Sequence, residues 1–301
     1  MAGKGGKLRA VCVLSAALAL CGSAYAQWTP QYEAGLVHDT NLSRAQNPED
    51  RIKDTALAAR AALARAFQIG DYADASVGAD VRLTRYTRSH GASFAAVGVN
   101  AGARRKLGLG LTAPWIALDG TASYEDAREN IRDGMRYALS FTAGKRFTPD
   151  LDASAGIAYD RRVQRKSYVE EEEEEEGAGY GGKPFSLQGR SLFARVNYAL
   201  GDRAGLIGAV ALRRGDVVSS TRRNPAIVDS SNAIADDPAF GPDFIAYRLS
   251  GARTRSLTGG ISWSLAPRTA LEATLTKDDT TVRGGLDYSA VIFALTLIHR
   301  Q

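Results

Sequence analysis

The stretch Ala73-Asp74-Ala75-Ser76-Val77-Gly78-Ala79-Asp80-Val81-Arg82-Leu83 alternates between apolar and polar residues without a break. Because successive side chains of a β-strand point to opposite faces, this run predicts a strand with one apolar face and one polar face. About a dozen segments of the chain share the pattern. In a membrane, a closed barrel of such strands would turn its apolar faces to lipid and its polar faces to the lumen.

Residues 1–26 have the features of an export signal ahead of these segments. Three basic residues come first, apolar residues follow from Ala10 to Leu20, and Ala24-Tyr25-Ala26 fits a small-x-small cleavage site. The alternative is cleavage before a lipidated Cys21, but the residue before such a cysteine is normally small and here it is Leu20. Export without a run of roughly 18 apolar residues points to a barrel in a bacterial outer membrane.

Twelve strands can be placed by this alternation. Their expected bounds are 29–38, 55–68, 72–86, 93–106, 112–126, 134–147, 151–166, 186–200, 204–218, 251–266, 269–281 and 287–299. The stretch from Ala56 to Ala66 is rich enough in alanine to form an amphipathic helix instead. We keep it as a strand because a helix would upset the order of the loops.

The connections alternate between short and long. The turns after the second, fourth, sixth, eighth and tenth strands are short and contain Gly, Pro or Asp, whereas the other set includes long polar loops at about 39–54, 167–185 and 219–250. Outer-membrane barrels have short periplasmic turns and longer external loops. The sequence therefore predicts an all-β fold: one antiparallel transmembrane β-barrel of about 12 strands over residues 27–301, with both termini in the periplasm.

Charge and cysteine content exclude several classes of function. The formal charge is +5, and removal of the three basic residues of the signal leaves about +2, which gives no support for nucleic-acid binding. Arginine outnumbers lysine, which fits recognition of phosphate or carboxylate and equally fits codon bias. Both cysteines, Cys12 and Cys21, lie in the signal, so the mature chain should hold no disulfide and no thiolate site.

Alternation also assigns the two faces of each strand. In the strands at 72–86, 134–147, 186–200 and 251–266 the apolar set, such as Leu83, Leu139, Leu192 and Leu257, should face lipid. The opposite face should carry the charged pore-lining residues Asp80, Arg82, Asp119, Glu125, Arg136, Arg146, Asp152, Asp160 and Arg162. Such charges can line an aqueous pore and set its selectivity, or they can lock together as an ion-pair ladder that fills a narrow barrel.

The segment from Tyr32 to Arg44 resembles the opening of a family of proteobacterial outer-membrane β-barrels, the "beta-barrel porin 2" type. In that family the first strand runs into a Tyr-Asp-(Ser/Asp/Thr)-Asn turn; here His38 replaces the Tyr, while Asp39, Thr40 and Asn41 match. The stretch from Tyr247 to Arg255 is also similar. The resemblance implies a link to exopolysaccharide export and defines no catalytic residues.

Two charged features lie in the long loops. Glu170 to Glu176 is a run of seven glutamates, which fits a solvated loop or a low-affinity trap for Ca²⁺ or a cationic partner. The loop arginines Arg51, Arg132, Arg222 and Arg223 could contact lipopolysaccharide phosphates or an acidic polymer, or they could simply be solvated.

The residues give little support for catalysis. After the signal the chain has three histidines, His38, His90 and His299, and no lipase-type serine motif or metal-ligand cluster accompanies them. We therefore expect no enzymatic activity and no cofactor.

Two functions remain. The first is a passive porin-like channel for small polar or anionic solutes, or for exopolysaccharide, selected by lumenal charge. The second is a structural or surface-binding barrel with a plugged lumen that acts through its external loops. Expected partners are outer-membrane lipid and lipopolysaccharide, the barrel assembly machinery and a polysaccharide; the chain ends at His299-Arg300-Gln301, whereas many such barrels end in an aromatic residue.

Overall fold

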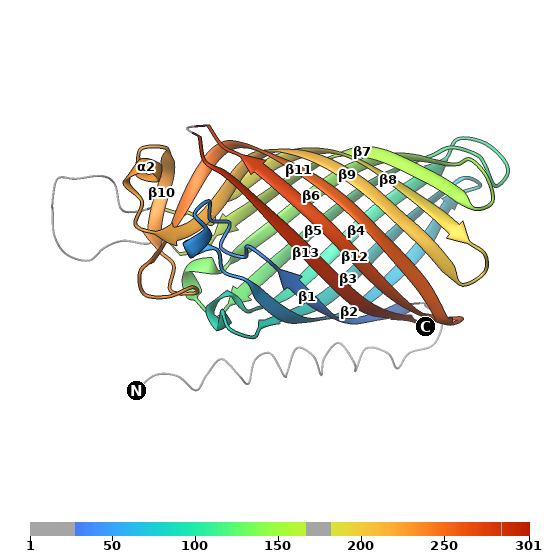
Figure 1. The fold of residues 1–301 in the computed structure, drawn as a ribbon. Helices are drawn as coiled ribbons and strands as arrows, with labels where there is room; N and C mark the ends of the chain where they lie inside the picture. Colours follow the sequence, from blue (N-terminus) through green and yellow to red (C-terminus); the bar gives the residue numbers. More distant parts are fainter. Residues whose placement is uncertain (1–27, 167–181, 284) are drawn as a thin grey trace.

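The computed structural model describes residues 28–166, 182–283 and 285–301, which fold into one antiparallel sheet. Twelve strands close into a barrel, because β1 pairs with both β2 and β13 and β9 pairs with β11 (Figure 1). The strands are β1 (Trp28–Asp39), β2 (Asp54–Gly70), β3 (Ala73–Tyr86), β4 (Phe94–Lys106), β5 (Trp115–Ala127), β6 (Gly134–Arg146), β7 (Leu151–Gln164), β8 (Leu187–Leu200), β9 (Ala204–Arg222), β10 (Ser231–Asp236), β11 (Phe244–Ala266), β12 (Thr269–Thr281) and β13 (Asp287–Arg300). The helices are short: α2 (Pro225–Val228) and the 3-10 turns η1 (Pro48–Asp50), η2 (His90–Ala92) and η3 (Asn130–Arg132).

The prediction of a barrel of about twelve strands is confirmed, and each expected strand is present. The alanine-rich segment is strand β2, so the helical alternative is wrong. Its register with β1 runs from Trp28 opposite Arg65 to Asp39 opposite Asp54, and β3 pairs with its other edge. Pairing on both edges satisfies the backbone of β2, which outweighs the intrinsic helix preference of alanine.

The prediction of a long polar loop at 219–250 is wrong. Strands β9 and β11 extend beyond their expected ends, and residues 217–222 pair with 244–249, while β10 pairs with the other edge of that part of β11. Tyr247 and Leu249 are fully buried there, in an apolar cluster with Ile234, Ile245 and Tyr288. Burial of these side chains stabilises the extension, and their spacing along the sequence did not reveal it.

The exposed apolar side chains are those expected on the lipid face. Leu83, Leu139, Leu192 and Leu257 are all about half exposed or more, and each lies in the predicted outward set. Tyr198 and Trp263 are exposed on the same face near the short turns. The barrel wall is therefore apolar on its outer side, as a lipid-facing wall must be.

The two ends of the barrel differ. The short turns gather at one end, where the C-terminus also lies, and the longer connections, α2 and β10 gather at the other (Figure 1). In the turn Gly201-Asp202-Arg203, Gly201 has a φ of 68°, a left-handed conformation that glycine adopts at no steric cost.

Among the helices of the described ranges, none is long and apolar enough to span a membrane.

Candidate functional site

The charged residues of the inner face form cross-strand groups. Asp80 forms an ion pair with Arg82 at 3.0 Å and lies 3.7 Å from Arg60 of β2, which in turn pairs with Glu33 of β1 at 3.0 Å. Two predicted residues, Asp80 and Arg82, are thus brought together. The alternation of β2 places Arg60 on the same inner face, so strand parity could have found it.

A second group spans β5, β6 and β7. Glu125 is nearly buried and lies 3.1 Å from Arg162 and 3.5 Å from Arg136. All three were predicted on the inner face. Their contact over three adjacent strands fits the concave side of a barrel, where side chains of successive strands converge.

Asp160 pairs with a residue that the sequence did not single out. Arg213 of β9 reaches across β8 and holds Asp160 of β7 with two hydrogen bonds of 3.1 and 2.8 Å. The strand between them carries Gly189, where an added Cβ would lie 2.3 Å from the Arg213 guanidinium. The glycine therefore leaves the space over β8 that the Arg213 guanidinium occupies in this ion pair.

The remaining predicted residues are spread along the wall. Asp152 accepts a hydrogen bond of 2.9 Å from Asn197. Asp119 lies against Gly102, where a Cβ would be 2.5 Å from the Asp119 carboxylate. Neither Asp119 nor Arg146 has a hydrogen bond or ion pair within the described ranges, so the structure does not unite the predicted set into one ladder.

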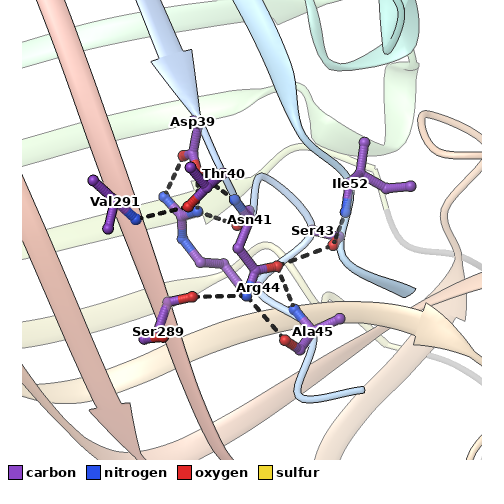
Figure 2. Close-up of polar contacts among 9 residues, drawn as sticks. All are labelled: Asp39, Thr40, Asn41, Ser43, Arg44, Ala45, Ile52, Ser289 and Val291. Atoms are coloured by element: carbon purple, nitrogen blue, oxygen red, sulfur yellow. Dashed lines mark hydrogen bonds and ion pairs between the residues drawn. The ribbon is translucent and has the colours of Figure 1, made fainter. Parts of the chain in front are cut away.

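The Asp39-Thr40-Asn41 turn holds the loop after β1 in place (Figure 2). Thr40 joins β13 through two hydrogen bonds with Val291, of 3.1 and 2.8 Å. The buried Asn41 amide donates to the carbonyl oxygens of Ala45 at 2.9 Å and Ser289 at 3.0 Å, and its oxygen accepts from the Ala45 amide and the Ser43 hydroxyl. The turn therefore fastens the loop both to itself and to the last strand.

Arg44 folds back over the same turn. Its guanidinium pairs with Asp39 at 2.8 and 2.9 Å and also donates to the carbonyl of Asn41. Its φ of 56° lies in the left-handed region, which is unusual for a residue other than glycine. Burial acts to lower the pKa of Arg44, but the hydrogen bond and charge of Asp39 hold that pKa above its ordinary value.

Asn41→Ala should destabilise the folded barrel by about 2 kcal/mol or more, because it leaves buried carbonyl and amide groups without partners. The measurement is urea unfolding of the refolded protein in detergent, followed by the shift in electrophoretic mobility between folded and unfolded forms. Asn47→Ala is the matched control, since Asn47 is exposed in the same loop and its side chain caps nothing. Equal midpoints for the two variants would contradict the role given to Asn41.

Two segments cross the loop end of the barrel, and together we call them the loop cap: residues 40–53 and residues 237–243. The first reaches β9, where the Ser220 amide donates to the carbonyl of Ser43 at 2.8 Å and the Ser219 hydroxyl donates to that of Arg44 at 2.9 Å. Thr221 also donates to the buried carboxylate of Asp50. Three strands, β11, β12 and β13, separate β9 from β1 along this side of the ring.

The second segment reaches the opposite wall. Arg132 holds Asp237 with hydrogen bonds of 3.0 and 2.5 Å, and the Ser220 hydroxyl donates to the same carboxylate at 2.5 Å. Asp237 is completely buried. An added Cβ on Gly91 would lie 2.6 Å from the Cα of Ala239, so the connection between β3 and β4 touches this segment. In the ring of twelve strands β4 is six places from β11, hence the segment spans the mouth.

Beneath the cap lies a cavity of about 710 Å³, which we call the arginine chamber. Its charged lining comprises Arg44, Arg132, Arg136, Arg162 and Arg213, with Asp160 and Asp216. A second cavity of about 710 Å³ lies above it, among the loops, with the basic residues Arg51, Lys53, Arg88 and Arg128 and the acidic Glu129. Phe240 lines both cavities, so the cap residue separates them. In both cavities the basic side chains outnumber the acidic ones.

The loop residues of this site were hard to foresee. Arg51 and Arg132 were singled out as loop arginines, and they prove to lie against the two cavities. Arg44 and Asp237 were missed, because their partners are fixed by loop folding and no period in the sequence reports it. The glutamate run Glu170–Glu176 and the signal at 1–26 lie outside the described residues.

The histidines make ordinary hydrogen bonds. His38 bonds to the Thr55 hydroxyl at 2.9 Å, His90 to the Tyr86 carbonyl at 2.9 Å and His299 to the Thr269 hydroxyl at 3.0 Å. None of them joins a serine and a carboxylate in the part of the chain that the structure describes. The described residues as a whole contain no cluster of three or more His, Cys, Asp or Glu that could hold a metal ion.

Comparison with known proteins shows the fold. No protein-family model matches the sequence, and no curated protein matches it. An outer membrane channel from Pseudomonas putida F1 superposes with a TM-score of 0.52 at 11% identity, over 93% of this chain and 97% of that one. The NanC porin is less similar, with a TM-score of 0.47 at 10% identity, over 89% of this chain and 98% of that one. The translocator domain of the autotransporter NalP from Neisseria meningitidis has a TM-score of 0.46 at 10% identity, over 98% of this chain and 95% of that one. The chain thus has the fold of outer-membrane β-barrels.

Proposed function

We propose that the chain is an outer-membrane porin-like channel that passes small anionic solutes. The exposed apolar wall supports a position in a membrane, and the likeness in fold to an outer membrane channel supports the outer membrane. In this proposal residues 1–26 are removed on export, residues 27–301 form the barrel, and the short turns and both termini face the periplasm. Lipopolysaccharide and the barrel assembly machinery are then its expected partners.

The single observation that carries the proposal is the charge of the two cavities at the loop end. Five arginines line the arginine chamber, and four basic residues line the cavity above it. Of the acids that pair with the chamber arginines, Glu125 and Asp237 are buried, whereas Asp160 lines the chamber beside Arg213; the five arginines of the lining outnumber its two aspartates. A solute that enters between the loops therefore meets guanidinium groups first, and fixed charge of one sign along a pore favours ions of the opposite sign.

A third cavity lies in the barrel interior nearer the short turns. It has a volume of about 300 Å³ and is lined by Arg104, Trp115 and Asp119 among others. Arg104 stacks on Trp115 with its guanidinium carbon 4.2 Å from the ring centroid. Charged and small side chains thus line space at both ends of the barrel interior.

Planar-bilayer recording tests the proposal. Refolded protein should give discrete conductance steps, and a salt gradient should give a reversal potential with the sign of anion preference. Refolded barrel without steps at any voltage would contradict a channel, and steps with cation preference would contradict the role of the arginines.

A second function is favoured by the loop cap, which crosses the mouth through two separate sets of contacts. A barrel held shut in this way would act through its loop surface, as a structural or surface-binding protein. Silent bilayer recordings from folded protein would favour this function. Passage of an exopolysaccharide, which the resemblance implies, would require the cap to move aside, because residues 237–243 span the mouth.

A further inference from the structure

Three arginines of the outer wall stand side by side on neighbouring strands. Arg190 of β8 is opposite Arg214 of β9, and Arg214 is opposite Arg253 of β11. Arg255, two residues along β11, is opposite Leu212, which places it next to the same row. All four lie on the face that carries the exposed leucines, and all four are exposed. Together they are named the outer arginine row.

Within the described residues the outer arginine row has no partner. None of its members makes a hydrogen bond or ion pair with any described residue. The acid closest in register is Asp279, opposite Arg255, and it pairs with Lys277 at 3.3 Å. Like charges directly opposite on paired strands are destabilising, so three adjacent arginines favour an anion that neutralises them.

An apolar groove adjoins the row. It has a volume of about 880 Å³ and is lined by the row itself and by Leu139, Phe141, Ile157, Leu192 and Leu212. These five side chains are about half exposed on the outer wall. A ligand of this surface therefore needs an anionic part for the arginines and an aliphatic part for the groove.

The row lies at the edge of the apolar belt. Outward residues from Leu192 to Leu200 of β8 are all apolar, and Arg190 is the next outward residue toward the loops. From Arg190 to Leu200 the strand advances by ten residues. This corresponds to a rise of about 34 Å along the strand, or about 26 Å along the axis of a barrel whose strands tilt by roughly 40°. This agrees with an apolar belt of about 25 Å. Tyr159, opposite Arg190, adds an aromatic side chain at the same level.

We propose that the outer arginine row and its groove bind a phosphorylated glycolipid of the lipopolysaccharide type, in the leaflet at the loop end. Guanidinium groups bind phosphate oxygens in pairs, and the row spans about 10 Å over two strand spacings, which suits two phosphates on one sugar headgroup. The acyl chains would lie in the groove. The choice of glycolipid over other anionic lipids rests on the proposed outer-membrane location with loops outward, since that leaflet presents lipopolysaccharide.

The test is binding of bisphosphorylated lipid A to the refolded full barrel in detergent, measured by native mass spectrometry. The variant R190Q/R214Q/R253Q/R255Q should bind it at least about tenfold more weakly than the unchanged barrel, because each basic residue at a membrane surface adds to the attraction for anionic lipid headgroups. The control variant R65Q/R105Q/R203Q/R268Q removes four arginines near the short turns and should leave binding unchanged. Electrophoretic mobility of folded protein establishes that each variant folds.

Binding measurements with other lipids and with phosphate identify the ligand. Phosphatidylethanolamine and millimolar inorganic phosphate should neither bind measurably nor compete. Equal binding of phosphatidylglycerol, or equal loss in both variants, would overturn the proposal. Bilayer conductance of the row variant should equal that of the unchanged barrel. If the barrel binds the lipid but never conducts, the channel function is refuted and the lipid site is not.

Discussion

Replacement of Asp237 by alanine should increase the single-channel conductance several-fold. Asp237 is fully buried and joins the cap segment 237–243 to Arg132 on the opposite side of the mouth and to Ser220 of β9. The substitution removes the hydrogen bonds that the Asp237 carboxylate accepts from Arg132 and Ser220. A hydrogen bond to a charged group contributes roughly 1.5–3 kcal/mol. Phe240, which separates the two basic cavities, would then no longer be held across the path.

The control for this prediction lies in the same segment. Asp243 is exposed, so Asp243→Ala changes the charge of the cap without breaking the contact across the mouth. Removal of residues 238–242 gives a second route to an open mouth if Asp237→Ala folds poorly. Unchanged conductance in both Asp237→Ala and the deletion, with folded protein, would refute the view that the cap limits the current.

The variant R136Q/R162Q/R213Q should reverse the charge preference of the channel. These three arginines line the chamber, and their loss leaves the carboxylates of Glu125 and Asp160 without the partners that they have in the structure. The wall then carries negative charge where it carried positive charge, and in a narrow, poorly screened interior such a change acts strongly on passing ions. Under a salt gradient the reversal potential should change sign.

The reciprocal variant provides the matched control. Glu125→Gln with Asp160→Asn leaves the three arginines without their carboxylates and should strengthen the anion preference. Shifts of the reversal potential in the same direction in both variants would contradict a role of these charges in selectivity. Arg44 is left unchanged in this series, because its contact with Asp39 supports the cap.

Strand alternation predicted the barrel and the face of each side chain, since lipid on one side and the interior on the other impose a period of two on every strand. The same parity also places Arg60 and Arg213 on the inner face, beside the residues that were predicted there. Pairing could not be predicted: Arg213 meets Asp160 only because two strands stand in a particular register with Gly189 between them.

The loop cap could not be predicted from the sequence. Its contacts join residues more than a hundred positions apart, such as Arg132 with Asp237, and irregular segments have no period from which such contacts could be deduced. Asp39-Thr40-Asn41 was known only as part of a resemblance. In the structure each of the three residues has a separate task, in holding Arg44, β13 and the loop itself.

The seam between the first and last strands has a consequence for biogenesis. Gln31 stands opposite Arg300 and Asp39 opposite Ile292, so the ring closes only when β13 has paired with β1. The same strand supplies Val291 and Ser289, to which Thr40 and Asn41 bind. The first cap segment therefore cannot be fastened to β13 in an unfinished ring, and its attachment reports that assembly is complete. A ring that lacks β13 would remain open on this side.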